Sequence, residues 1–172
     1  MAKSKTAVAA SAVSKQAAAL STDAARKREL DKLKQVEQES FQTRQRFRER
    51  FYLQEIYEVW WSWPASKRRS FARQAGRLSK IDTRPSSHPI RVLIDCTSPS
   101  TEERMKSRWT QALRLAEVLN VPPSNLEKLG KKYGGVAGCA RAYAAHRKEL
   151  AANRQEKLQN LRQKNRVKMK AR

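Results

Sequence analysis

The sequence predicts a mostly α-helical protein, and three observations lead to this fold class. Residues 22–62 contain neither Gly nor Pro and are rich in strong helix formers. Apolar residues recur there, and again after residue 101, at the three- and four-residue steps of a helix with one buried face. One stretch, residues 89–96, is instead rich in β-branched side chains and bounded by Pro and Ser. We therefore expect a long N-terminal helix, a compact multi-helix basic domain with one short extended segment, and disordered basic termini.

The composition is strongly basic, with 38 Lys and Arg against 16 Asp and Glu and a formal net charge of +22 on 172 residues. Such a surface repels itself and gains free energy when it docks on phosphates and releases their counterions. No apolar run reaches the ~18 residues that a membrane span requires, and no secretory signal is evident. We therefore expect a soluble protein of the cytoplasm or nucleoid (the nucleus in a eukaryote) that is not secreted and has no membrane partner.

The charge is unevenly distributed, and it divides the chain into five segments. Residues 1–21 contain three Lys, no acid and many Ala and Ser, which indicates a disordered basic arm, although organelle transit peptides share this composition. Residues 22–63 are nearly neutral, whereas residues 64–98 hold an Arg-rich helix, a loop and the extended segment. Residues 99–146 are predicted to form a helical module. Residues 147–172 are predicted to be a basic tail, either helical or disordered.

The near-neutral segment is predicted to be one helix from Thr22 to about Ser62. A helix of this length that is charged on most faces needs a partner for its apolar stripe. We therefore expect it to pack on another helix or to form a homodimer through residues 22–63. Three Trp near its end predict either a core or interface cluster, or a platform on which single-stranded bases stack: Trp60, Trp61 and Trp63.

The Arg-rich helix is expected over residues 64–79, with Pro64 in its first turn. Its three arginines at i, i+4 and i+8 lie along one face: Arg69, Arg73 and Arg77. A row of guanidinium groups with no acid between them is unfavourable alone and favourable against phosphates. We expect this row to bind nucleic acid, and a solvated basic face is the alternative.

Residues 115–129 carry the most specific pattern in the sequence. Ala116 provides a small side chain in one predicted helix, and Asn120, four residues on, tolerates the left-handed backbone of a tight turn. Three aliphatic residues follow for burial: Val121, Leu126 and Leu129. This pattern resembles the helix-turn-helix of repressor-like DNA-binding proteins.

The resemblance implies that the second helix of the motif exposes its N-terminal part to the major groove of DNA. It places five residues near bases or phosphates: Ser124, Asn125, Lys128, Lys131 and Lys132. Basic residues of the tail are expected to add phosphate contacts: Lys164, Arg166 and Lys168. Two other structures fit the same region. One is a plain αα-hairpin in the core, and the other is a ribbon-helix-helix dimer whose strand, residues 89–96, enters the groove.

No catalytic, metal or cofactor site is indicated by the sequence. Cys96 and Cys139 do not stand at zinc-site spacing from His88 or His146. The pair of Cys139 and His146 lacks a carboxylate to orient the imidazole. We therefore expect a small non-catalytic DNA-binding regulator or accessory factor. The alternatives are an RNA-binding or ribonucleoprotein component and a protein–protein adaptor with a basic surface.

Overall fold

The computed structural model describes residues 22–40, 48–84 and 86–170, with the backbone alone at residue 48 and over 160–170. This part of the chain is helical and contains no strand, so the predicted fold class is confirmed. The predicted disordered arm, residues 1–21, lies outside the described residues. After a helix over residues 22–40, the elements follow in this order: α2 (Arg48–Ser62), the short 3-10 helix η1 (Ala65–Lys67), α3 (Arg68–Leu78), α4 (Pro89–Thr97), α5 (Glu103–Val118), the short 3-10 helix η2 (Pro123–Asn125), α6 (Leu126–Tyr133) and α7 (Gly135–Lys170).

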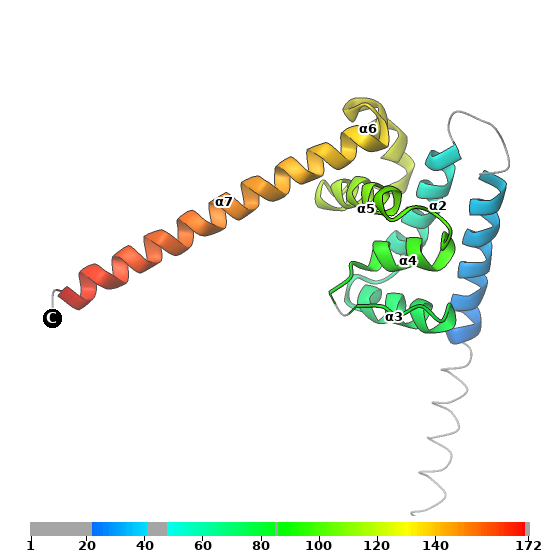
Figure 1. The fold of residues 1–172 in the computed structure, drawn as a ribbon, viewed down its shortest axis with the longest axis horizontal. Coiled ribbons are helices and arrows are strands. Elements are labelled where there is room, and N and C mark those ends of the chain that lie inside the picture. Colours follow the sequence, from blue (N-terminus) through cyan, green and yellow to red (C-terminus); the bar gives the residue numbers. More distant parts are fainter. Residues whose placement is uncertain (1–21, 41–47, 85, 171–172) are drawn as a thin grey trace, which may run out of the picture.

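The predicted single helix over residues 22–62 is wrong, because the chain folds back on itself. The helix over residues 22–40 and α2 run side by side in opposite directions (Figure 1). Lys32 Nζ lies 2.7 Å from Glu55 Oε2, whereas in one continuous helix these residues would be about 35 Å apart. Folding back buries the apolar stripes of both helices within one chain. The reason for expecting a homodimer through residues 22–63 is thereby removed.

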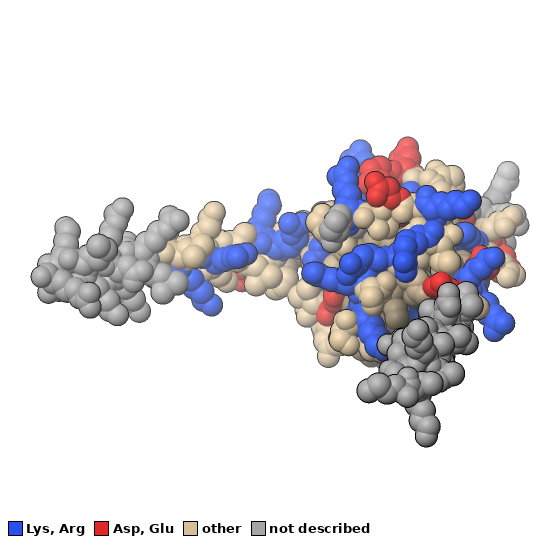
Figure 2. Space-filling model, turned by 90° about the horizontal axis from the view of Figure 1, so that it is seen from below, with Lys and Arg blue, Asp and Glu red and all other residues tan. Residues whose placement is uncertain are grey.

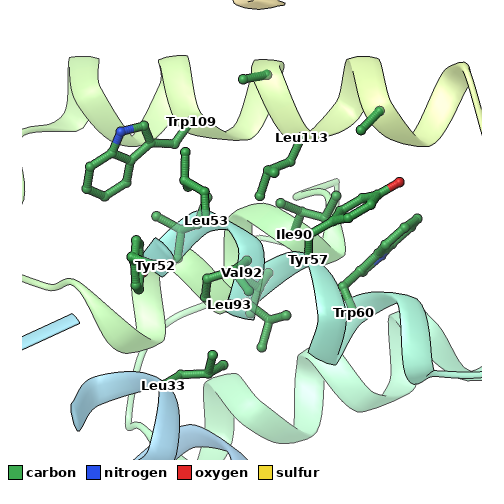
Figure 3. Close-up of a cluster of buried hydrophobic side chains, with 14 of the residues drawn as sticks. Leu33, Tyr52, Leu53, Tyr57, Trp60, Ile90, Val92, Leu93, Trp109 and Leu113 are labelled. Carbon is green, nitrogen blue, oxygen red and sulfur yellow. The ribbon is translucent and has the colours of Figure 1, made fainter. Parts of the chain in front are cut away.

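The core lies between this helical pair, α4 and α5, and Figure 3 shows its larger side chains. Its buried members include Leu33, Tyr52, Tyr57, Trp60, Ile90, Leu93, Trp109 and Leu113. The hydroxyl of Tyr52 lies 2.6 Å from Thr97 Oγ1 and accepts a hydrogen bond from Ser98 Oγ at 2.8 Å. Burial raises the pKa of the Tyr52 phenol, so this polar group stays neutral inside the core.

The tryptophan cluster belongs largely to this core. Trp60 and Trp63 are buried, and Trp61 is half-buried with its ring centroid 5.7 Å from that of Tyr57. The guanidinium of Arg68 lies 3.8 Å from the centroid of the Trp60 ring and covers it on the outer side. These positions support the core interpretation over a platform for single-stranded bases.

Residues 89–97 form α4, so the predicted extended segment over residues 89–96 is wrong. His88 caps the helix, because its Nδ1 accepts a hydrogen bond from the Ile90 amide at 3.3 Å, and Pro89 occupies the first turn. The helix packs among α2, α3 and α5 and buries side chains on most of its faces. Neither a helical nor a strand period is therefore visible in its sequence. With no strand in this stretch, the ribbon-helix-helix alternative is excluded.

The region beyond residue 99 is helical, as the sequence predicts for residues 99–146. α7 packs on α5 and α6 through its first turns and then projects from the domain as a single helix (Figure 1). Every residue from Arg147 to Gln159 is exposed. The predicted basic tail, residues 147–172, is thus helical as far as Lys170. Among the helices described, none has the length and apolar character needed to cross a bilayer.

Candidate nucleic-acid interface

The turn between α5 and α6 has the geometry that the sequence predicts. Asn120 adopts a left-handed backbone with φ of 51°, and Ala116 is fully buried. The Val121 amide donates to the Ala116 carbonyl at 2.9 Å, and the Tyr57 hydroxyl donates to the Val121 carbonyl at 3.0 Å. The second bond joins the turn to α2, so the position of α6 is set by the core of the protein.

On its inner side α6 rests against the start of α7. Leu129 is buried there, and Cys139 Sγ approaches the Leu129 carbonyl at 3.9 Å. A Cβ atom at Gly138 would lie 1.5 Å from the Tyr133 carbonyl oxygen. Close packing of two helices is therefore what the small residues after Tyr133 provide. Burial raises the pKa of the Cys139 thiol, which makes it a poor nucleophile.

The outer side of α6 carries the residues expected to contact DNA. Ser124, Lys128, Lys131 and Lys132 are exposed, and Asn125 is half-exposed. All five residues from the sequence prediction are thus on the surface of one short segment.

The single acid of α6, Glu127, is neutralised by two neighbours. Its carboxylate pairs with the Arg50 guanidinium from α2, and its other oxygen lies 2.9 Å from Lys131 Nζ. Without these partners, the Glu127 carboxylate would place a negative charge on the side of α6 that is expected to face phosphates. Because Arg50 reaches it from another helix, the surface around α6 remains cationic.

Three arginines that sequence reasoning missed lie beside this surface. Arg104 and Arg108 from α5 and Arg141 from α7 line a groove of about 720 Å³ between the two helices. All three are exposed. The acid at the groove edge, Glu103, accepts hydrogen bonds from Arg91, which hold the pKa of that carboxyl below its usual range. The i, i+4 spacing of Arg104 and Arg108 was the available signal.

Arg108 joins this groove to the region of α6. It also borders a larger hollow of about 890 Å³ whose lining includes Lys131 and Arg50. The floor of that hollow is apolar and is formed by residues such as Leu113 and Leu129. The two hollows are therefore neighbours that share Arg108, and cations of α5, α6 and α7 contribute to their linings.

The arginine row of α3 is exposed as predicted. Arg69, Arg73 and Arg77 lie on the outer face, while the opposite face buries Ala72 and Ala75 against the rest of the domain. Figure 2, seen from the end of the domain at which α3 lies in Figure 1, shows Lys and Arg side chains gathered over that end.

The structure does not bring the two predicted sets of cations together. In Figure 1, α3 and α6 lie at opposite ends of the domain, with α2, α4 and α5 between them. The tail residues Lys164, Arg166 and Lys168 belong to α7, which carries them away from the domain as far as their backbone is described.

The chain matches no protein-family model, no curated protein and no solved structure. Within residues 22–40, 48–84 and 86–170, no group of three or more His, Cys, Asp or Glu side chains could hold a metal ion. The arrangement of cations is therefore the feature from which a function can be argued.

Proposed function

We propose that this protein is a small, non-catalytic DNA-binding regulator or accessory factor that presents α6 to duplex DNA. The observation that carries the proposal is that α6 presents an exposed basic side and is held in place by the core. Its exposed side carries Lys128, Lys131 and Lys132, its one acid is neutralised by Arg50, and the turn before it is fixed to the core. In helix-turn-helix proteins a helix held in this way supplies contacts to base edges and phosphates.

The groove arginines extend the proposed interface. Phosphates dominate the affinity of protein–DNA complexes, and each neutralised phosphate contributes through counterion release. Arg104, Arg108 and Arg141 make no ion pair among the described residues, so binding them to phosphates breaks no bond of the fold. They would fix the position of the duplex while α6 faces the major groove of the DNA.

RNA is the second candidate, and α7 is the observation that favours it. Its exposed residues 147–159 include four basic side chains and two acidic ones, and such a basic helix can follow the phosphates of a folded RNA by shape. A protein–protein adaptor would use the same charge only for solubility.

Gel-shift titrations on duplex DNA, structured RNA and single strands separate these candidates. We expect duplex DNA to bind most tightly, with an affinity that falls steeply as salt rises. The variant with Lys128→Ala and Lys131→Ala should bind duplex DNA about tenfold more weakly than the parent, because two phosphate contacts are lost. Its melting temperature should stay close to that of the parent, since an exposed i, i+4 pair contributes only about 0.3–0.5 kcal/mol.

The matched control removes two charges elsewhere. Lys27→Ala with Lys34→Ala lowers the net charge equally, and both residues are exposed on the helix over residues 22–40 without an ion pair among the described residues. An equal loss of affinity in both variants would show that charge alone binds DNA and that α6 has no special role. Tighter binding of structured RNA than of duplex DNA would favour the second candidate, and absence of binding at low salt would favour the adaptor.

A further inference from the structure

The outer face of α3 forms a basic surface of its own. Arg69, Arg73 and Arg77 follow one another at intervals of four residues, and the sequence of α3 contains no acid. Among the described residues, none of the three makes an ion pair or a side-chain hydrogen bond, whereas the Nε of their neighbour Arg68 donates to the Trp63 carbonyl at 3.3 Å. Like charges at i, i+4 destabilise a helix, so this row of arginines lowers the stability of α3 in the isolated protein. Bound phosphates would reverse that effect.

The distance between this face and α6 can be estimated along α2, which contacts both α3 and α6. Near one end of α2, Arg50 pairs with Glu127 of α6, and near the other end Trp60 lies under Arg68 of α3. These two positions of α2 are ten residues apart, which is about 15 Å along the helix axis. The arginine row lies on the far side of α3, about one helix diameter of 10 Å further out. The two basic surfaces are therefore on the order of 25 Å apart.

The two surfaces also lie at opposite ends of the domain. α3 packs on α4, so the opposite face of α3 points away from the domain, and it is this end that Figure 2 shows studded with Lys and Arg. α6 packs on α7 at the other end of the domain, and the core lies between α3 and α6 (Figure 1). A straight duplex lying on α6 would thus leave the α3 face unoccupied.

We propose that the α3 face binds a second segment of nucleic acid, so that one molecule bridges two duplexes. This inference rests on the proposed function, because it assumes that α6 and the groove arginines hold the first duplex. The bridge needs no dimer, since both surfaces belong to one chain and α2 joins them rigidly through the core.

A two-duplex capture assay tests the bridge. A biotinylated duplex is fixed on beads, full-length protein is added at low salt, and capture of a fluorescent second duplex is measured. Sedimentation of the protein in the same buffer, alone and with one duplex, tests whether the protein is a monomer in both states. The parent should capture the second duplex. The variant Arg69→Gln, Arg73→Gln, Arg77→Gln should capture about tenfold less, because three phosphate contacts on one surface are lost.

Two controls isolate the α3 face. The same variant should still bind a single duplex in a gel shift with little change in affinity, and it should melt at the temperature of the parent, since the three side chains are exposed. The charge-conserving variant Arg69→Lys, Arg73→Lys, Arg77→Lys should capture like the parent, because lysine also binds phosphates as a point charge.

The outcomes are distinguishable. Undiminished capture by the glutamine variant overturns the inference, as does a parent that binds one duplex and captures no second one. In both cases the proposed function stands. A parent that binds no duplex at all rejects the proposed function, and the bridge falls with it.

Discussion

α4 and the projecting part of α7 are both helices, yet they form for opposite reasons. Seven of the nine residues of α4 are buried, whereas every residue from Arg147 to Gln159 is exposed. α4 contains four β-branched residues and is helical because its side chains pack on three other helices. α7 makes no such contacts beyond the domain and is helical because Ala, Lys, Arg, Gln, Glu and Leu favour the helix. The comparison teaches that tertiary burial decides one helix and local propensity the other.

The cations of the two regions differ in the same way. Arg91 of α4 binds Asp95 through Nε at 2.9 Å and also holds Glu103. Burial and these hydrogen bonds fix the guanidinium within the fold. The basic residues of α7 between 147 and 159 make no ion pair among the described residues. The first kind of cation stabilises the protein, and the second is available to a partner.

The largest change in the free energy of unfolding is expected from a substitution that creates a cavity at α4. Leu93→Ala should lower the free energy of unfolding by about 2–5 kcal/mol, because Leu93 is almost completely buried and its removal leaves a cavity. Leu158→Ala in α7 is the matched control, since the side chain is half exposed and its loss should change stability by less than about 0.5 kcal/mol. Urea unfolding of both variants measures this difference. Equal losses would mean that α7 also depends on packing.

A truncation after residue 146 tests the other half of the comparison. It removes ten basic and two acidic residues, a net charge of +8, without touching the core. We expect affinity for duplex DNA at low salt to fall about ten- to hundredfold, with a shallower dependence on salt. Thermal melting followed by circular dichroism should give an unchanged midpoint. A lower midpoint would contradict the view that the projecting helix takes no part in folding.

The same contrast exists between two neighbours in α3. Arg68→Ala should lower stability by about 1 kcal/mol, because the guanidinium covers the buried Trp60 ring. Arg69→Ala should change it by less than about 0.5 kcal/mol and should instead weaken capture of a second duplex. Denaturant unfolding and the two-duplex capture assay on the two single variants check both statements. Reversed effects would show that the two arginines are assigned to the wrong roles.

The smallest effect on global stability is expected from a glycine in α7. Ala152→Gly costs about 1 kcal/mol of local helix stability, so the helical signal at 222 nm should decrease. The unfolding midpoint of the domain should stay the same, because residue 152 lies beyond the core. A shift of that midpoint would mean that α7 and the domain unfold as one unit.

The parts of the fold that the sequence predicts are those with local signals. Asn120 ends α5 in a left-handed conformation, and Gly134 does the same for α6 with φ of 77°. These boundaries depend on backbone chemistry that a few residues determine. The arginine row of α3 was placed correctly for the same reason, since i, i+4 spacing alone fixes its face.

The parts of the structure that the sequence did not predict depend on contacts between residues far apart in the chain. No sequence signal near residue 40 predicts that Lys32 will contact Glu55. The sequence of α4 shows no hydrophobic period because most faces of this helix are buried. In the candidate site, the neutralisation of Glu127 by Arg50 joins residues 77 positions apart, and so it could not be inferred from spacing. Arg141 entered the groove through the packing of α7 on α5.

The length of α7 has one further consequence for a bound duplex. Residues 147–170 extend about 36 Å at the rise of an α-helix, which equals one helical turn of duplex DNA. A straight rod of this length cannot stay in one groove for a full turn, because the groove winds around the duplex axis beneath it. If α7 lies along the axis of a bound duplex, its far end therefore meets the phosphates on the other side of the groove. The footprint of the protein would then extend about one turn, or 10 base pairs, beyond the segment that α6 touches.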